Sequence, residues 1–308
     1  LWSRGLGDVY KRQIEYRFVD ENKTPLTDWA VYDDNNKPLQ DANFKGYAEA
    51  RAVDKAGNVS DSKLNDGYVI DEQAPTDIVI TSEAGEETYE SDTWTSKDVT
   101  IKLSSTAYSG IYRYYYSVNG SDWTEIDGDT ITVKNQGEWN YKFKAVSYAD
   151  NETVTQNDFK VKIDKTEPVV RVDFEGTFGR WSADGVQFSM SILNQAISGV
   201  RYYYSTDGGK SWIQAEEGSI ITIDEDVDAS YIFKAINGAG VESNVSDSYR
   251  VMIDTKKPTL EYTLETEEKT DKPYNVLFNV NTGRSGLKSV SVNGKDITGE
   301  KSFEVSDN

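Results

Sequence analysis

Hydrophobic and polar residues alternate along several short stretches of the chain. In "FKVKI" (159–163) the Phe, Val and Ile share one face and the two lysines share the other, and "YRVMI" (249–253) repeats this arrangement. The stretch "YKFKA" (141–145) alternates in the same way. A period of two is typical of a β-strand that buries one face. We therefore expect a chain built from short, half-buried strands.

Two stretches rich in tyrosine predict a further strand and its turn. "YRYYYSVNGSDW" begins at residue 112 and "VRYYYSTDGGKSW" at residue 200, and each contains residues that tolerate the positive φ of a tight hairpin. "IEYRF" (14–18) resembles the same strand. The alternation assigns one set of side chains to the core, with a Trp following on the return strand: Tyr112, Tyr114, Tyr116 and Trp123, and then Val200, Tyr202, Tyr204 and Trp212.

These motifs repeat with a period near 90 residues. The prolines that end "YVIDEQAP", "VKIDKTEP" and "VMIDTKKP" are Pro75, Pro168 and Pro258, which lie 93 and 90 residues apart. The pair "SG" recurs at residues 109, 198 and 285. Such a period suits one β-sandwich of about seven strands in each repeat.

The repeats divide the chain into domains joined by short links. We predict domains at 76–168 and 169–258, a truncated one at 14–75 before them and a truncated one at 259–308 after them. Only Asp-Lys-Thr-Glu-Pro separates the strand that ends at Ile163 from the following domain. Because proline fixes φ and stiffens its neighbour, we expect the sandwiches to be arranged as beads on a semi-rigid rod.

The first residues do not fit this pattern. "SRGLGDVYKRQ" (3–13) has no hydrophobic period and matches nothing downstream. A DNA string that resembles a transposon-type sequencing adapter can encode it. We interpret residues 1–13 as a non-native, adapter-derived segment, as left by a metagenomic assembly, and the remainder as a fragment of a longer gene.

Composition excludes several kinds of chemistry. The chain has no cysteine and no histidine, so disulfides, thiol chemistry and the commonest general base are excluded. Its formal net charge is −20, which repels a polyanionic backbone and disfavours nucleic-acid binding. It contains no run of 18 apolar residues, so we expect no membrane insertion of this fragment.

The order of the motifs resembles a known family. "WTSKDVTI", "SG", "YYYS", "YKFKAVS" and "VKIDKTEP" follow one another between residues 94 and 168, and "AVDKAGNVS" lies in the first repeat. This succession is similar to the bacterial Ig-like (Ig/fibronectin-type) repeats of large surface or secreted proteins, over essentially residues 14–308. The fourth repeat departs from the pattern, because "SVSVNG" replaces the tyrosine strand. The resemblance implies an all-β fold of tandem Ig-like β-sandwich domains.

The resemblance also implies a function. Domains of this family are spacers, adhesive modules or appendages of carbohydrate-active enzymes. We expect a non-catalytic spacer or stalk of an extracellular or cell-surface bacterial protein, which presents an adhesive or enzymatic domain outside this fragment. The alternative is an adhesion module that binds glycan or a host surface protein. As a spacer, the chain would have neighbouring domains of the same protein as its partners.

Outward-facing residues of the tyrosine strands are the candidates for ligand contact. Tyr115 and Tyr203 could form an aromatic platform for sugar rings, each near an arginine, Arg113 or Arg201. The structural alternative is cross-strand pairing on a sheet face, or partial cover by a neighbouring loop.

No motif predicts catalysis. "STDGGKSW" (205–212) fits S-x-D-x-G-x-x-W, the Asp-box hairpin of sialidase-like propellers, where the motif is a structural turn. The other tyrosine stretch lacks it. The 53 acidic residues include no pair whose spacing marks a glycosidase, so we expect no enzyme.

Recurrent aspartates raise the question of calcium. Asp71, Asp164 and Asp254 lie at the domain junctions, and Asp54 lies in "VDKAGN". Calcium needs six to eight oxygen ligands, and no EF-hand-like or other dense Asp spacing is present. We expect no cofactor, and interpret these residues as a solvated acidic face with caps on the linkers, with Ca²⁺ at the junctions as the alternative.

Overall fold

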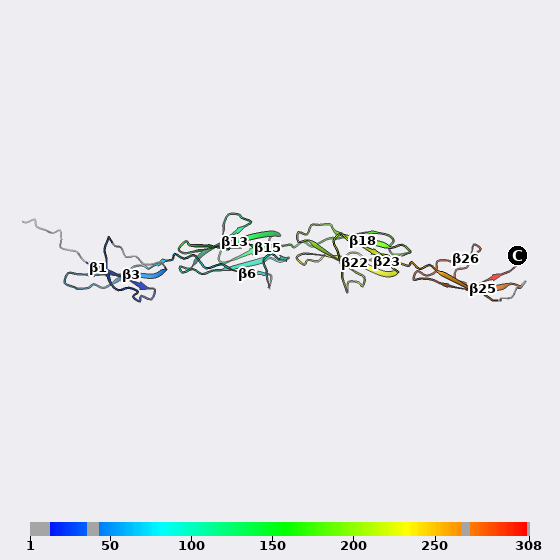
Figure 1. The fold of residues 1–308 in the computed structure, drawn as a ribbon, viewed down its shortest axis with the longest axis horizontal. Coiled ribbons are helices and arrows are strands. Elements are labelled where there is room, and N and C mark those ends of the chain that lie inside the picture. The colour runs from blue at the N-terminus through cyan, green and yellow to red at the C-terminus, as the bar shows by residue number, and fades with distance from the viewer. Residues whose placement is uncertain (1–12, 36–42, 266–271, 307–308) are drawn as a thin grey trace, which may run out of the picture. The chain divides into compact units, whose positions relative to one another are not determined.

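Strands supply the regular structure of the chain. The computed structural model describes residues 13–35, 43–265 and 272–306, and within them every regular element is a β-strand (Figure 1). These residues contain no helix that is long and apolar enough to span a membrane. The all-β expectation of tandem β-sandwiches is confirmed. The chain divides into two units, residues 1–93 with 97–163 and residues 94–96 with 164–308, which are taken in turn.

The first repeat forms an antiparallel sheet around the pair β1–β3, with the order β2-β1-β3-β4 and β5 also paired with β3. Phe18 and Phe44 are buried, and the Phe44 ring lies 4.9 Å from that of Tyr68. Of the interpreted adapter segment only Gln13 is described, as the start of β1. The strands are β1 (Gln13–Asp20), β2 (Ala30–Val31), β3 (Phe44–Val53), β4 (Lys63–Leu64) and β5 (Tyr68–Ile70).

The second repeat packs two antiparallel sheets. One has the order β12-β9-β6-β7, and the other contains β11, β10, β13 and β15 in that order, with β14 on β13. The strands are β6 (Val79–Ala84), β7 (Glu87–Thr88), β8 (Trp94–Thr95), β9 (Val99–Ser104), β10 (Ile111–Val118), β11 (Thr124–Ile126), β12 (Thr130–Val133), β13 (Gly137–Ser147), β14 (Glu152–Val154) and β15 (Phe159–Ile163).

The third repeat has the same two layers. Its sheets have the orders β16-β18-β21 and β17-β23-β22-β19-β20, and β17 runs parallel to β23. The strands are β16 (Val170–Glu175), β17 (Trp181–Ser182), β18 (Val186–Ile192), β19 (Val200–Ser205), β20 (Ile213–Ala215), β21 (Ile220–Ile223), β22 (Val227–Asn237) and β23 (Tyr249–Ile253).

The β24 strand of the fourth repeat is largely exposed to solvent. Its sheet has the order β24-β25-β28, and β26 pairs with β27. On β24, Leu260 is 60% and Tyr262 70% exposed, whereas Val276 and Ile297 are buried. The strands are β24 (Thr259–Leu264), β25 (Tyr274–Asn281), β26 (Ser291–Val292), β27 (Lys295–Asp296) and β28 (Ser302–Val305).

Separate cores fill the second and third repeats. The predicted alternation is confirmed in β15 and β23, whose Val and Ile residues are fully buried between the sheets. Each core holds four buried rings, and each such ring removes roughly 150–250 Å² from water. They are Tyr89, Tyr114, Tyr141 and Phe143 in the second repeat, and Phe188, Tyr202, Tyr231 and Phe233 in the third. The positions of the domain boundaries stay a prediction.

The tyrosine strands follow the predicted faces with one exception. Tyr114 and Tyr202 are buried and Tyr116 and Tyr204 pack against the cores, as expected. Tyr112 was assigned to the core but is 45% exposed. A register shift between Ile111 and Arg113, where β10 pairs with β13, marks a β-bulge. The extra residue reverses the alternation, so that Tyr112 faces solvent.

The two tryptophans after the tyrosine strands also differ from the expectation. Trp123 is 39% exposed and Trp212 is half-buried, and neither belongs to the buried cores. Each lies one residue before its return strand, β11 or β20. Their rings instead lie over lysine ammonium groups, that of Trp123 over Lys144 and that of Trp212 over Lys234.

Candidate functional site

A lysine lies beneath aromatic rings on the outer face of the second repeat. Tyr115 on β10 is directly opposite Lys144 on β13. The Lys144 ammonium lies 5.0 Å from the centre of the Tyr115 ring and 5.3 Å from that of Trp123. Its Nζ also bonds the Glu152 carboxylate at 2.9 Å. Cation–aromatic and ionic contacts together hold this side chain flat against the sheet.

The third repeat builds the same cluster. Tyr203 on β19 is opposite Lys234 on β22, and the Lys234 ammonium lies 4.7 Å from the Trp212 ring centre. Lys234 pairs with Glu242 at 3.0 Å, and the Tyr203 hydroxyl donates to Gln214 at 3.5 Å. The candidates Tyr115 and Tyr203 are thus engaged in cross-strand pairing on a sheet face. A role for either residue in ligand contact stays a prediction.

The two candidate arginines have different surroundings. Arg113 donates to Glu125 and to the hydroxyl of Tyr112, and its guanidinium lies 4.3 Å from the Tyr112 ring centre. The hydrogen bond to Glu125 raises the pKa of Arg113 above its usual value. Arg201 is exposed, opposite Ile236 on β22. From the sequence we expected the two arginines to be equivalent. Of the two, only Arg113 lies against an outward-facing tyrosine, Tyr112, which occupies the bulge.

The junction aspartates bind the Ser-Gly turns of the repeats that follow them. Asp71 accepts hydrogen bonds from the amide and hydroxyl of Ser109, at 2.9 and 2.7 Å. Asp164 accepts the same two bonds from Ser198, at 3.0 and 2.6 Å. Asp254 accepts a 2.7 Å bond from the amide of Ser285. We call each such pair a junction latch.

Each latch aspartate also closes its own linker turn. The carboxylates accept from the amides of Gln73, Thr166 and Lys256, two residues further on in each case. In the third latch the amide of Asp254 donates to the Ser182 carbonyl at 3.0 Å, within the third repeat. Asp254 is therefore bonded to the repeat before the linker and to the repeat after it.

Burial and charge distinguish these carboxylates from a solvated acidic face. Asp71, Asp164 and Asp254 are 7%, 0% and 7% exposed, so the expectation that they are solvated was wrong. The expectation that they cap the linkers agrees with their hydrogen bonds to the linker amides. Hydrogen bonds from Ser109 lower the pKa of Asp71, and those from Ser285 lower that of Asp254. Burial raises the pKa of Asp164, but the hydrogen bonds from Ser198 and Thr166 together outweigh it, and the net direction is downward.

The geometry of the junctions does not support the alternative that they bind calcium. In the described ranges no group of three or more acidic residues is arranged to hold a metal ion. Asp54 is exposed and accepts bonds from the amides of Ala56 and Asn58, so it closes its own loop. The expectation of no cofactor, with Ca²⁺ at the junctions as the alternative, stays a prediction.

The latch could have been found in the sequence, because its two halves recur together. Each Ser-Gly pair follows its aspartate by a similar interval, 38, 34 and 31 residues. The glycines Gly110, Gly199 and Gly286 have φ of 88°, 78° and 75°, a conformation that favours glycine over residues with a Cβ. Serine supplies the two donors and glycine the turn, which explains why the pair is repeated.

The Asp-box stretch of the third repeat forms a hydrogen-bonded loop. Asp207 accepts bonds from the amides of Lys210 and Ser211 at 3.0 Å, and from the hydroxyls of Ser205 and Ser211. The bonds from Ser211 contribute most to a pKa of Asp207 far below the usual range. Both oxygens of the carboxylate thus accept hydrogen bonds from within the turn, which agrees with the interpretation of this motif as structural.

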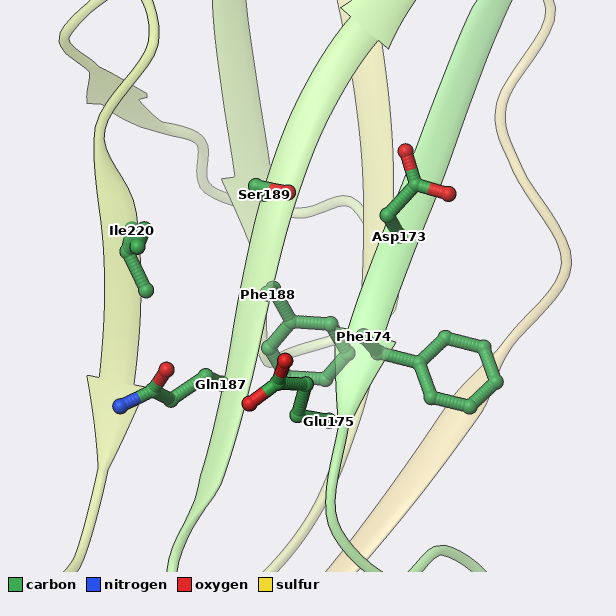
Figure 2. A pocket seen from close by; sticks show the side chains of 7 residues that line it. All are labelled: Asp173, Phe174, Glu175, Gln187, Phe188, Ser189 and Ile220. Carbon is green, nitrogen blue, oxygen red and sulfur yellow. The ribbon is translucent and has the colours of Figure 1, made fainter.

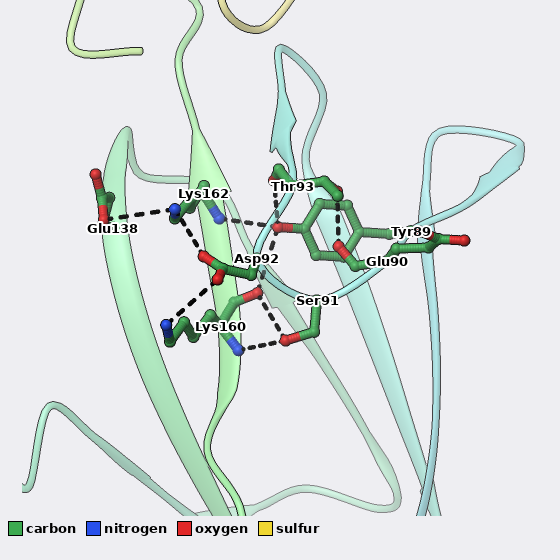
Figure 3. A network of polar contacts seen from close by, with 8 residues as sticks. All are labelled: Tyr89, Glu90, Ser91, Asp92, Thr93, Glu138, Lys160 and Lys162. Atoms are coloured by element: carbon green, nitrogen blue, oxygen red, sulfur yellow. Dashed lines mark hydrogen bonds and ion pairs between the residues drawn. The ribbon is translucent and has the colours of Figure 1, made fainter.

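A second polar network closes the loop before β8 in the second repeat (Figure 3). Asp92 accepts ion pairs from Lys162 at 2.6 Å and Lys160 at 3.3 Å, which lower its pKa. The buried Tyr89 hydroxyl donates to the Thr93 carbonyl at 2.7 Å and accepts from the Lys162 amide at 2.9 Å. The network fastens this loop to β15 and leaves its polar groups engaged with one another.

A shallow hollow of about 210 Å³ lies over β16, β18 and β21. Figure 2 shows the side chains of Glu175 and Gln187 beside each other on neighbouring strands, with Asp173 and Ser189 further along. Asp173 and Glu175 are both exposed, and Asp173 is paired with Arg171 at 2.7 Å. Burial is one way in which proteins tune a catalytic carboxyl group, and neither of these carboxylates is buried.

Comparison with known proteins gives structural likenesses alone. No known family matches the sequence, and no curated protein matches it. Similar solved structures include the fibronectin(III)-like modules of Clostridium thermocellum CbhA, at 12% identity over 56% of this chain and 93% of that one, with a TM-score of 0.31. The FN1–FN3 domains of chicken CNTN1 match at 14% identity over 82% and 92%, with a TM-score of 0.31. A tetra-tandem repeat from the extending region of a large adhesion protein matches at 12% over 96% and 83%, with a TM-score of 0.33.

Proposed function

We propose that this chain is a non-catalytic spacer of a bacterial cell-surface or secreted multidomain protein. The observation that carries the proposal is the junction latch, which recurs wherever one repeat gives way to the next. A linker that only joins two domains needs no buried side chain, and flexible linkers are rich in Gly and Ser. A recurrent buried carboxylate instead supports a linker that is held in place.

The latch is suited to this function because its bonds are short-range and charge-assisted. A carboxylate that accepts several N–H and O–H bonds holds its partners about twice as strongly as a neutral acceptor does. The proline that ends each link, such as Pro168 or Pro258, restricts the backbone further. Together these features support a spacer that holds its outer domain at a defined distance from its inner one.

Two further properties fit a spacer. The net charge of −20 favours solubility and keeps copies apart. The cores are closed by aromatic rings without any disulfide, so folding requires no oxidising step. The partners of such a spacer are the neighbouring domains of the same protein, one of which would be adhesive or enzymatic.

The proposal is tested by measuring how firmly a latch holds its junction. Because the chain has no cysteine, the full chain with Ser191→Cys and Thr263→Cys can be spin-labelled on two exposed positions either side of Asp254. We expect a narrow distribution of distances between the labels. Asp254→Asn should broaden it, and Asp247→Asn, a change at an exposed aspartate, should not.

A wild-type distribution as broad as that of the Asp254→Asn variant would contradict the proposal. Scattering from the full chain provides an independent check, since a spacer should give an extended profile. Hydrolysis of a polysaccharide by the purified chain would also contradict a non-catalytic function.

A further inference from the structure

The segment that runs from the Ser-Gly turn to the end of the YYYS motif is one residue longer in the second repeat than in the third. Ser109 and Ser117 are eight positions apart, whereas their counterparts Ser198 and Ser205 are seven apart. The extra residue is Tyr112, which occupies the bulge in β10. Strand β19 pairs with β22 without any shift, so this fold does not need the bulge.

A second tyrosine differs between the repeats at the same place. Tyr148 donates its amide to the Gly110 carbonyl at 3.1 Å, and Gly238 donates to the Gly199 carbonyl at 3.0 Å in the third repeat. Tyr148 therefore occupies the position of a glycine. The rings of Tyr112 and Tyr148 lie 5.2 Å apart at an angle of 50°, and the two residues are 45% and 67% exposed.

Polar groups flank this tyrosine pair in fixed positions. The Arg113 guanidinium lies over the Tyr112 ring, donates to the Tyr112 hydroxyl and is ion-paired with Glu125. Its orientation is thus determined before any ligand arrives, which lowers the entropic cost of binding. The charges of Arg113 and Glu125 compensate each other, so the patch offers directed donors and acceptors with little net charge.

Stability does not explain this patch. Exposed rings contribute little to a core, and a bulge disrupts the ladder of hydrogen bonds. Bulges are enriched at sheet edges and next to active sites, where they re-aim a side chain or end the pairing. Two exposed aromatic residues that the sister repeat lacks, brought together by an insertion, therefore point to a function in recognition.

We propose that Tyr112, Tyr148 and Arg113 form a binding site for a neutral saccharide on the second repeat. Exposed aromatic faces can pack against the C–H face of a sugar ring, and the arginine, the glutamate and the tyrosine hydroxyls can bond its hydroxyl groups. The net charge of −20 disfavours sulfated, sialylated or phosphorylated ligands. This site is separate from the spacer function, which stands without it.

The test is to probe the full chain with an array of neutral, sialylated and sulfated oligosaccharides, followed by NMR titration with the best-retained neutral one. We expect Tyr112→Ala and Tyr148→Gly each to weaken binding at least tenfold. Tyr262→Ala, a change at a tyrosine of the fourth repeat that is about as exposed as Tyr148, should leave affinity unchanged. Deletion of Tyr112 should give β10 the same unshifted pairing that β19 has in the third repeat, and it should abolish binding.

Three results would overturn the proposal: no neutral oligosaccharide is retained, only acidic ones are retained, or the variants bind as the wild type does. Unfolding midpoints of all variants in urea show whether they remain folded. They should, because the substituted side chains are exposed and Tyr148→Gly reproduces the residue of the third repeat.

Discussion

Replacement of Asp164 by Asn tests the energetics of a junction latch. The side chain is fully buried and accepts bonds from the Ser198 amide, the Ser198 hydroxyl and the Thr166 amide, at 3.0, 2.6 and 3.0 Å. Asparagine keeps the shape but loses the charge, and it turns an NH₂ group towards donors. Because each bond to a charged group is worth about 1.5–3 kcal/mol and Asn retains one acceptor, we expect a loss of about 2–4 kcal/mol.

The assay must report the third repeat separately from the others. Hydrogen exchange with mass spectrometry, performed on the full chain over a range of urea concentrations, gives an unfolding free energy for peptides from β19, β22 and β23. A loss of about 2–4 kcal/mol corresponds to a fall of roughly 8–30 °C in the melting temperature of a domain of this size. Asp247→Asn, at an exposed position, is the matched control and should change nothing.

A double-mutant cycle shows whether the loss belongs to the latch. Asp164→Asn and Ser198→Ala should be strongly non-additive, since each removes the same bonds. If Asp164→Asn costs less than about 1 kcal/mol, or if the two changes are additive, the buried bonds are not what holds the linker. The reasoning behind the spacer function would then fail.

Three further predictions concern the core, the pH dependence and metal ions. Phe233→Ala should destabilise the third repeat by about 3–5 kcal/mol because its ring is fully buried, and Phe174→Ala, at a half-exposed ring, should cost clearly less by the same exchange assay. The lowered pKa values of Asp71, Asp164 and Asp254 contribute stability that is complete above their unfolded-state pKa of about 3.9 and is lost as pH falls through the folded-state values. The urea midpoint should therefore hold from pH 7 to about pH 5 and fall below about pH 4, and a midpoint that rises on acidification would contradict this sign. Chelation of calcium should leave the midpoint unchanged, because the latch oxygens are already engaged by serine and backbone donors; a fall would restore the calcium hypothesis.

The period of two was enough to predict much of the fold. It identified β13, β15 and β23 and their buried residues, because one half-buried face leaves little freedom in register. It failed at Tyr112, where one inserted residue reverses the faces, and at Trp123, which an exposed hairpin loop carries away from the core. Alternation says nothing about a bulge, and aromatic character alone does not separate a core ring from one that covers a lysine.

The candidate sites were harder to predict, since they depend on contacts between distant segments. Tyr115 and Arg113 were chosen for facing outward, but Lys144 and Tyr112, which contact them, come from an opposite strand and from a bulge. The latch was present in the sequence as two separate repeats, an aspartate and a Ser-Gly pair. Their joint recurrence links the two, but the contact itself, in which the aspartate accepts hydrogen bonds from the serine, is visible only in the fold.

The lysines beneath the aromatic rings have a practical consequence. The Lys144 and Lys234 side chains are 14% and 12% exposed, and each is enclosed by a ring, a carboxylate and the sheet. Amine-directed reagents and trypsin both require a lysine that can leave the surface, so these two amines should escape acylation and cleavage in the native chain. The aromatic rings that cover Lys144 and Lys234 thus protect these two positions from proteases that cleave after lysine.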